Sequence, residues 1–289
     1  MTIGFRGPLF ILLSCSLASI TGTLEQVAPE GATPVMLTEV RMGLGALCLL
    51  AWCLALRRLP PALSTIPKLP ALGMIAMVVL YQLFFFTAVK EVGVAVGTVV
   101  SISTTPVWAA AVAYLFTRKK PSRAWYPATF MAVAGVVLLN WGELTPESLA
   151  GLALPVAAGL CYAFEINFVK RLAPLMAPEA IMLLETGGAA LILLPFACFF
   201  PAAWILTPQG MAVSAALGVF TAALAYAFFT VGLQTVSAPT ASTLALSEPF
   251  IAACLGIFFL AEPMTPFTGI GLALMFLAVV ILIPGEGRN

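Results

Sequence analysis

Four glutamates inside long apolar stretches are the residues of this sequence best placed to do chemistry. They are Glu39, Glu165, Glu185 and Glu248. An acidic side chain near the bilayer centre costs about 2.5–3.5 kcal/mol on insertion scales, so such residues usually face a cavity or a partner. There a carboxylate can bind an ammonium group or relay a proton. Glu248, roughly 13–14 Å into its stretch at helical rise, is the first candidate for both roles, with a hydrogen bond to a neighbouring helix as the alternative.

The other three acids have weaker claims on a central site. Glu39 and Glu185 are predicted at shallower depths on opposite sides of the membrane, and Glu39 can also snorkel or pair with Arg41. Glu165 lies close to Lys170, near a predicted helix end. That position favours contact with water or pairing with a basic residue, but we retain Glu165 as a candidate contact for a substrate.

Aromatic and amide side chains in the apolar stretches are further candidates for a binding site. Their polar atoms need partners at that depth, so a cavity lining is reasonable. An aromatic lining would suit flat or apolar ligand side chains, and packing within a helical bundle is the alternative for each residue. The candidates are Tyr81, Gln82, Phe85, Trp108, Tyr162, Tyr226 and Ser247.

Two prolines fall near the middle of predicted helices. Pro106 and Pro249 each remove a backbone hydrogen bond and clash with the preceding turn, so a kink is expected at both. Serine and threonine residues precede each proline, and their hydroxyls can satisfy freed carbonyls. The two prolines are therefore candidate hinges, and static kinks that help packing are the alternative.

The residue types that are missing exclude much of enzyme chemistry. The sequence contains no His and no Asp, which removes Ser-His-Asp triads, His-containing zinc sites and the HExxH motif. It also contains no GxxxxGK[ST] phosphate loop. The six cysteines lie in apolar stretches without CxxC spacing. We therefore expect no enzyme, no metal, no cofactor and no nucleic-acid partner.

Membrane-spanning helices must position these residues, because the chain is 62% hydrophobic and only 9% charged. A helix needs roughly 20 apolar residues to cross a bilayer. The sequence predicts an all-α integral membrane protein of ten transmembrane helices, whose loops leave no room for a soluble domain. The predicted spans are 6–26, 33–56, 69–89, 92–116, 124–141, 149–170, 178–200, 209–233, 239–260 and 266–284.

The basic residues collect in alternate gaps between these spans. Lys90 alone lies on one side and Arg41 lies inside a span. Short basic loops stay cytoplasmic, so both termini are predicted on the cytoplasmic side of a bacterial inner membrane. The basic residues of the cytoplasmic side are Arg6, Arg57, Arg58, Lys68, Arg118, Lys119, Lys120, Arg123, Lys170, Arg171 and Arg288.

The two halves of the chain align with each other. Glu39 then matches Glu185 and Pro106 matches Pro249, and both residue types are costly inside a membrane helix. Each half holds five spans, an odd number, so the second half must enter the membrane in the opposite orientation. The sequence predicts one transmembrane domain over 1–289, with inverted repeats at about 6–141 and 149–284, the arrangement that carriers use for alternating access.

With these features the chain resembles the EamA-type drug/metabolite transporters, and within that superfamily the YddG-type exporters of aromatic amino acids and other metabolites. The resemblance covers nearly the whole chain, although Lys119 stands where the first repeat would carry the counterpart of an acidic residue. Its clearest motifs are Ser247-Glu248-Pro249, Ala261-Glu262 and the glycines Gly269 and Gly271.

The resemblance implies a secondary transporter that exports amino acids or related small metabolites. We expect spans three, four, eight and nine to surround a midplane cavity, with spans five and ten at a static edge. A proton-coupled exporter of lipophilic cations is the main alternative. Anionic cargo is disfavoured, because Arg41 is the only basic residue inside a span. A channel, a scramblase or an intramembrane enzyme using Ser/Lys, Cys or Glu chemistry are further alternatives, and a monomer is compatible with the sequence.

Overall fold

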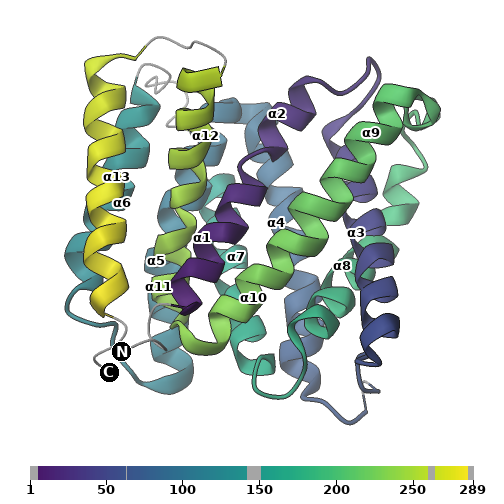
Figure 1. The fold of residues 1–289 in the computed structure, drawn as a ribbon, viewed down its shortest axis with the longest axis horizontal. Coiled ribbons are helices and arrows are strands. Elements are labelled where there is room, and N and C mark those ends of the chain that lie inside the picture. Colours follow the sequence, from purple (N-terminus) through teal and green to yellow (C-terminus); the bar gives the residue numbers. More distant parts are fainter. Residues whose placement is uncertain (1–5, 63, 142–150, 260–263, 286–289) are drawn as a thin grey trace.

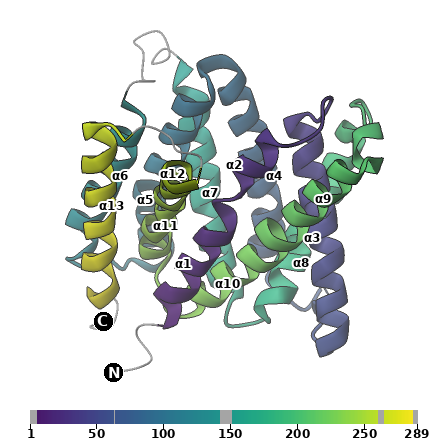
Figure 2. The ribbon, with the colours of Figure 1, turned by 45° about the horizontal axis from the view of Figure 1, so that its top comes forward.

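A computed structural model describes residues 6–62, 64–141, 151–259 and 264–285. In this part of the chain all regular structure is helical. The long helices run across a single bundle (Figure 1), and α1 begins at the end of the bundle where α13 finishes (Figure 2). An even number of crossings, as the sequence predicts, requires this placement.

The first half of the chain supplies five of the crossings. Its helices are α1 (Arg6–Ala18) with α2 (Thr21–Gln26), α3 (Pro34–Leu56), α4 (Lys68–Val92), α5 (Val94–Thr117) and α6 (Trp125–Leu139).

The second half supplies the other five crossings. Its helices are α7 (Ala153–Leu172), α8 (Pro178–Ala197), α9 (Pro208–Ala216), the π-helical segment Leu217–Leu224, α10 (Ala225–Thr235), α11 (Ala238–Ala245), α12 (Ser247–Phe259) and α13 (Pro266–Gly285).

Nine helical segments in the described ranges are long and apolar enough to cross a membrane. The remaining predicted span, the fifth, is α6, which has 15 residues, or roughly 22 Å at helical rise. That is less than a bilayer core of about 30 Å. The predicted all-α fold of ten membrane helices is confirmed, with α6 as its shortest member.

Polar residues and a glycine set where several helices begin. The hydroxyl of Thr33 accepts a hydrogen bond from the Met36 amide at 3.4 Å, and the hydroxyl of Thr207 accepts one from the Gly210 amide at 3.0 Å. These N-caps satisfy amides that have no partner within the helix. Gly93 has a φ of 86° and alone separates α4 from α5. A side chain would strain that backbone conformation.

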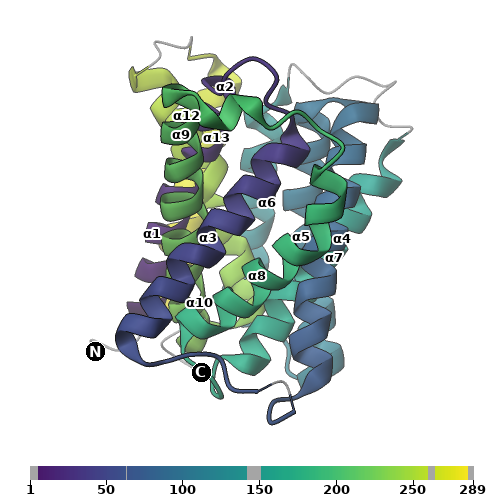
Figure 3. The ribbon, with the colours of Figure 1, turned by 90° about the vertical axis from the view of Figure 1, so that its right-hand side faces the viewer.

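The packing of the helices follows the two repeats, because each helix pair has an equivalent pair when the repeats are interchanged. α4 packs against α7, and its counterpart α10 packs against α1. Two further pairs join equivalent helices: α6 with α13 at one edge (Figure 1), and α3 with α8 at the other (Figure 3). The edge position predicted for spans five and ten is therefore observed.

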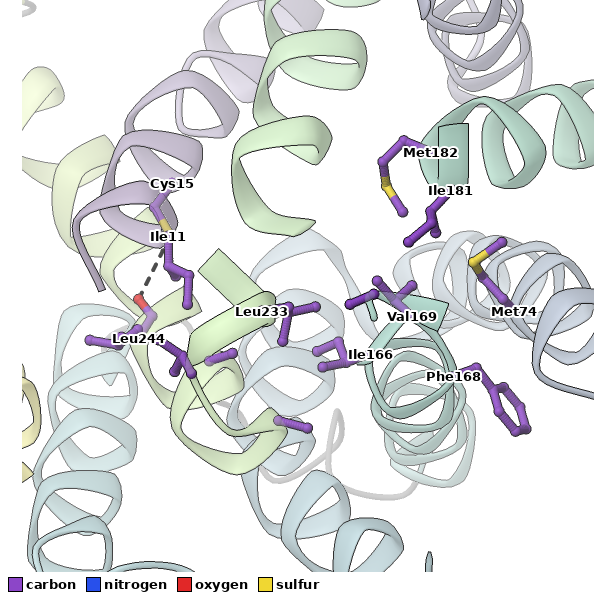
Figure 4. Packing of buried hydrophobic residues seen from close by; sticks show 14 of the residues in the cluster. Ile11, Cys15, Met74, Ile166, Phe168, Val169, Ile181, Met182, Leu233 and Leu244 are labelled. Atoms are coloured by element: carbon purple, nitrogen blue, oxygen red, sulfur yellow. Dashed lines mark hydrogen bonds between the residues drawn. The ribbon is translucent and has the colours of Figure 1, made fainter. Parts of the chain in front are cut away.

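Buried apolar side chains from both repeats meet in the core (Figure 4). Ile11 of α1, Ile166 of α7, Leu233 of α10 and Leu244 of α11 are all fully buried in one cluster. Lipid tails are as apolar as these side chains, so close packing rather than the hydrophobic effect holds such helices together. This contact links the opening helix of each repeat to the region around α10 and α11.

Three predicted spans are not continuous α-helices. The first is interrupted between Ala18 and Thr21, the eighth contains the π-helical segment Leu217–Leu224, and the ninth is interrupted at Leu246. π-Helical turns and breaks in membrane helices often accompany functional sites. The eighth and ninth spans are also those that carry Tyr226 and Glu248.

Candidate functional site

Arg41 and Tyr226 form a direct link between the two repeats inside the bundle. Nη2 of Arg41, on α3, donates a hydrogen bond to the Tyr226 hydroxyl, on α10, at 3.3 Å. The guanidinium carbon also lies 6.0 Å from the centre of the Tyr226 ring, within the range of a cation–π contact. Arg41, the basic residue that the sequence places inside a span, thus contacts an aromatic residue of the other half of the chain.

A second link between the repeats is aromatic. The ring of Tyr81, on α4, lies 5.5 Å from the ring of Tyr162, on α7, and 5.6 Å from that of Phe85, one turn along α4. Such tilted and offset ring pairs are favourable contacts. Together the three rings form an aromatic wall where α4 and α7 pack.

Besides Glu25, which acts on Arg41 from the end of α2, three carboxylates act electrostatically on these groups. Glu248, on α12, interacts with Arg41 and also with Tyr81, Tyr162 and Tyr226. Arg41 and Glu248 do not form an ion pair, since their nitrogen–oxygen distance exceeds 4.0 Å.

The other two carboxylates lie deeper in the protein. Glu165, on α7, and Glu185, on α8, interact with each other, and both interact with Tyr226. Glu165 is 7% exposed and Glu185 is 2% exposed. The expectation that Glu165 contacts water or a basic residue is therefore wrong. Neither Glu165 nor Glu185 forms a salt bridge within the described ranges.

Unlike the buried Glu165 and Glu185, the other five residues of this cluster remain partly exposed. Arg41, Tyr81, Tyr162, Tyr226 and Glu248 are all only half-buried, although they come from five helices and interact with one another. Side chains that converge in this way cannot each turn their accessible surface to lipid. These five residues therefore form one electrostatic cluster, which α3, α4, α7, α10 and α12 bring together.

Lys170 lies near Glu165 in sequence but has other partners. Its ammonium group donates hydrogen bonds to the backbone carbonyls of Leu233 and Val236, at the end of α10. Helix C-termini present unpaired carbonyls and a negative dipole end, which a lysine satisfies well. Lys170 therefore ties α7 to the corner between α10 and α11 on the side where the sequence predicts cytoplasm.

Four candidates from the sequence do not join the cluster through any described contact. Glu39 and Gln82 are buried, and each has a polar atom without a hydrogen-bond partner among the described residues. The Ser247 hydroxyl donates to the Leu244 carbonyl at 2.6 Å, so it serves the interruption in the ninth span. Trp108 is half-buried on α5 and forms none of the ring contacts found in the described ranges. Their roles in binding stay predictions.

The two candidate hinges occupy different structural positions. Pro106 lies inside the continuous helix α5, whereas Pro249 is the third residue of α12, just after the interruption at Leu246. The kink expected from Pro249 is thus displaced to a break one turn earlier. In α5 the helix continues through the proline.

Arg41 is the residue that sequence reasoning overlooked, although it carried a usable signal. A basic side chain within an apolar span is by default a functional candidate, and α3 contains only this one in 23 residues. The cavity expected between spans three, four, eight and nine stays a prediction, and the cluster also includes residues of other helices. α3, α7 and α8 contribute Arg41, Tyr162, Glu165 and Glu185.

Comparisons with known proteins agree with this architecture. A model of the EamA-like transporter family matches residues 5–141 and again residues 149–283. The uncharacterized transporter YwfM of Bacillus subtilis (strain 168) is 34% identical over 275 residues, which cover 95% of this chain and 92% of YwfM. The threonine/homoserine exporter RhtA of Escherichia coli (strain K12) is 28% identical over 268 residues, or 90% of this chain and 85% of RhtA.

A crystal structure that is 19% identical in sequence has a TM-score of 0.81 and covers 95% of both chains. At that identity the likeness shows a shared fold. The two matches of one family model correspond to the two repeats.

Proposed function

From the premise that this chain belongs to the EamA-like transporter family, we propose that it exports amino acids or related small metabolites by alternating access. The resemblance drawn from the sequence is thereby confirmed at the level of the family. The observation that carries the proposal is the cluster around Arg41, Tyr226 and Glu248, whose members come from both repeats. A site shared by two repeats changes its exposure when one repeat moves against the other.

The arrangement of the repeats supports the alternating-access part of the proposal. Five crossings per repeat would start α7 on the opposite side of the membrane from α1, which makes the repeats inverted. The exchange of helix pairs between the repeats is compatible with a two-fold axis in the membrane plane. Together with the basic loops, this favours cytoplasmic termini and a location in the bacterial inner membrane.

The composition of the site supports amino acids as the class of substrate. The cluster contains a guanidinium, several carboxylates and an aromatic wall. An amino acid offers a carboxylate, an ammonium group and a variable side chain to such a set. RhtA, one of the relatives, is named as an exporter of threonine and homoserine, which favours the same class here.

A proton-coupled exporter of lipophilic cations is the second candidate. The observation that favours it is the pair Glu165 and Glu185, two buried carboxylates that interact with each other and with Tyr226. Buried acids of this kind can exchange a proton for a cation. Arg41 opposes this function, since it would repel a cation at the site.

Counterflow in liposomes tests the proposal. Purified protein is reconstituted into vesicles loaded with an unlabelled amino acid, and uptake of the labelled amino acid is measured over a panel, with and without a pH gradient. A carrier accelerates uptake when the same compound is loaded inside, whereas an open pore does not. Labelled tetraphenylphosphonium in the same assay tests the second candidate.

The Glu248→Gln variant tests the site itself. Losing a charge-assisted hydrogen bond should lower the apparent affinity for substrate by roughly tenfold or more. Glu30→Gln is the matched control, because Glu30 is exposed between α2 and α3. If Glu248→Gln transports every substrate as the wild type does, at every pH, Glu248 has no part in binding or coupling.

A further inference from the structure

The charge of Arg41 lacks a direct counter-ion within the described part of the protein. A cation inside a membrane span is costly unless it is paired. The described ion pair of this chain joins Arg58 to Glu179 and does not involve Arg41. Nη2 of Arg41 donates to a neutral hydroxyl, that of Tyr226, and its Nε is buried without a hydrogen-bond partner. The guanidinium thus has unused donors toward the interior of the bundle.

Two carboxylates attract this guanidinium from a distance. Glu25 stands at the exposed end of α2, and Glu248 faces the cluster from α12. Glu248 lies beyond 4.0 Å from the nitrogens of Arg41 and yet interacts with them. A cation and an anion thus lie near each other without forming an ion pair.

An arginine that keeps free donors is suited to a carboxylate. Its planar fork matches the two oxygens of a carboxylate in bidentate geometry, which a point charge such as lysine does not. A small anion could therefore accept hydrogen bonds from the unused donors of Arg41. Because Glu248 also lies near Arg41 without pairing with it, a purely anionic ligand would be repelled at its other end.

A zwitterion satisfies both ends at once. In an α-amino acid the ammonium and the carboxylate sit on the same carbon, so receptors for them must be close but not in contact. We propose that Arg41 binds the carboxylate and Glu248 binds the ammonium group of a single zwitterionic amino acid. This inference rests on the proposed function and narrows its substrate class from small metabolites to zwitterions.

The aromatic wall then faces the variable part of the ligand. Tyr81 interacts with both Arg41 and Glu248 and stacks on Phe85. A ligand held between the two charges would place its side chain near these rings and near Tyr162. The sequence disfavours purely anionic cargo because Arg41 is the only basic residue inside a span. The clamp is compatible with that expectation, since one arginine opposite one glutamate selects cargo that carries both charges.

Analogues that lack one charge test this clamp. Each amino acid that the wild type transports is compared with its methyl ester, which has no carboxylate charge, and with its deaminated acid, which has no ammonium group. Competition against counterflow of the labelled amino acid gives an apparent affinity for each compound. Arg41→Gln, Arg41→Lys and Glu248→Gln are tested beside the wild type. Arg123→Gln is the control, because Arg123 is an exposed arginine between α5 and α6.

The expected pattern is different for each variant. Arg41→Gln should lower the affinity for the free amino acid by roughly tenfold or more and leave that for the ester unchanged. Arg41→Lys, which keeps the charge without the fork, should lose less, and it serves if the neutral variant fails to fold. Glu248→Gln should weaken binding of the amino acid and the ester alike.

Two outcomes would overturn the inference, and they can be told apart. If the wild type transports amino acids but Arg41→Gln keeps the same preference for the acid over its ester, the clamp is wrong and the proposed function stands. If the wild type transports no amino acid of the panel, the proposed function fails and the clamp fails with it.

Discussion

The fourth and ninth membrane spans carry the same proline at equivalent positions, but the two helices differ. α5 runs without interruption from Val94 to Thr117 with Pro106 inside it. The ninth span is divided at Leu246, and Pro249 sits in the first turn of α12. A proline within a helix costs about 3 kcal/mol, whereas one in the first turn costs little, because its missing N–H would have no partner there. Pro106 is therefore in a costly position inside a helix, whereas Pro249 is in a position that prolines tolerate.

The neighbours of the two spans account for this difference. Gly159 of α7 allows α5 to pack closely, since a Cβ atom there would lie 2.6 Å from the Ser101 carbonyl. The ninth span packs instead against α1, the opening helix of the first repeat, which presents Cys15. Its thiol lies 3.7 Å from the carbonyl of Leu244 and 3.9 Å from that of Ala245. Ala245 is the carbonyl that a continuous helix would leave unpaired at Pro249, so the break has a donor beside it.

If transport follows the proposed alternating access, each proline serves both a continuous and an interrupted helix. In an inverted-repeat carrier, the two repeats exchange conformations when access changes sides. The opposite state would then contain an interrupted α5 and a continuous ninth span. In that state Pro106 would favour the interruption of α5.

The largest effect is expected for Pro106→Ala. The new N–H can donate to the Ile102 carbonyl, so α5 would gain about 3 kcal/mol as a continuous helix. The state with an interrupted α5 would become less populated by on the order of 100-fold. Transport in liposomes should slow by more than tenfold, while amide hydrogen exchange in α5 should become slower.

Pro249→Ala is the matched variant, and it should shift the equilibrium the other way. It permits a continuous helix through Leu246, so slower hydrogen exchange is expected around Leu246 and not in α5. Its effect on the stability of the present state should be small, because Pro249 lies in a first turn. If both variants transport at the rate of the wild type and exchange is unchanged, neither proline acts as a hinge.

The sequence was sufficient for the helices that depend on local composition. α3 was predicted over 33–56 and spans Pro34–Leu56, and its start follows from the Thr33 cap and the proline after it. Apolar length alone identifies such spans, because an unpaired backbone in lipid is too costly. The two repeats and the family resemblance could also be predicted, because residues matched between the halves and short motifs are visible in the sequence.

The interruptions and the full site could not be predicted, because they depend on contacts between distant residues. The break at Leu246 is accompanied by the thiol of Cys15, more than 200 positions earlier. The site requires Arg41 of α3 to meet Tyr226 of α10. Hydropathy gives the depth of a residue but not the direction in which it points, so Glu248 was recognised while the orientation of Arg41 was not.

A smaller effect, on stability, is expected for Gly159→Ala. The added methyl would lie 2.4 Å from the Thr104 hydroxyl and 2.6 Å from the Ser101 carbonyl, so α5 and α7 must separate. Overpacking of this kind costs about 1–3 kcal/mol. The melting temperature of the purified protein should fall, and hydrogen exchange in α5 should become faster.

Gly43→Ala is the control for that change. No atom lies within 4 Å of a Cβ at Gly43, which is in the helix α3. Alanine should there be neutral or stabilising by about 0.5–1 kcal/mol. Equal melting temperatures for the two variants would mean that the close approach of α5 and α7 does not keep α5 continuous.

The smallest effect is expected for Cys15→Ala. Loss of the thiol removes the weak donor beside Leu244 and Ala245, worth about 0.5–1 kcal/mol, and should therefore disfavour the broken ninth span. Slower hydrogen exchange around Leu246 with a slightly lower melting temperature would show this. Cys15→Ser, which keeps a donor of similar size, should behave like the wild type.

Cys161→Ala separates this donor effect from packing. The alignment that matches Glu39 with Glu185 also matches Cys15 with Cys161. Cys161 is likewise buried, but its thiol forms no hydrogen bond among those found in the described ranges. Its variant should lose the same side-chain volume without changing exchange at Leu246. If Cys15→Ala and Cys161→Ala gave the same exchange pattern there, the thiol would contribute only packing. The difference between the two spans would then have to come from Pro249 and the helices around it.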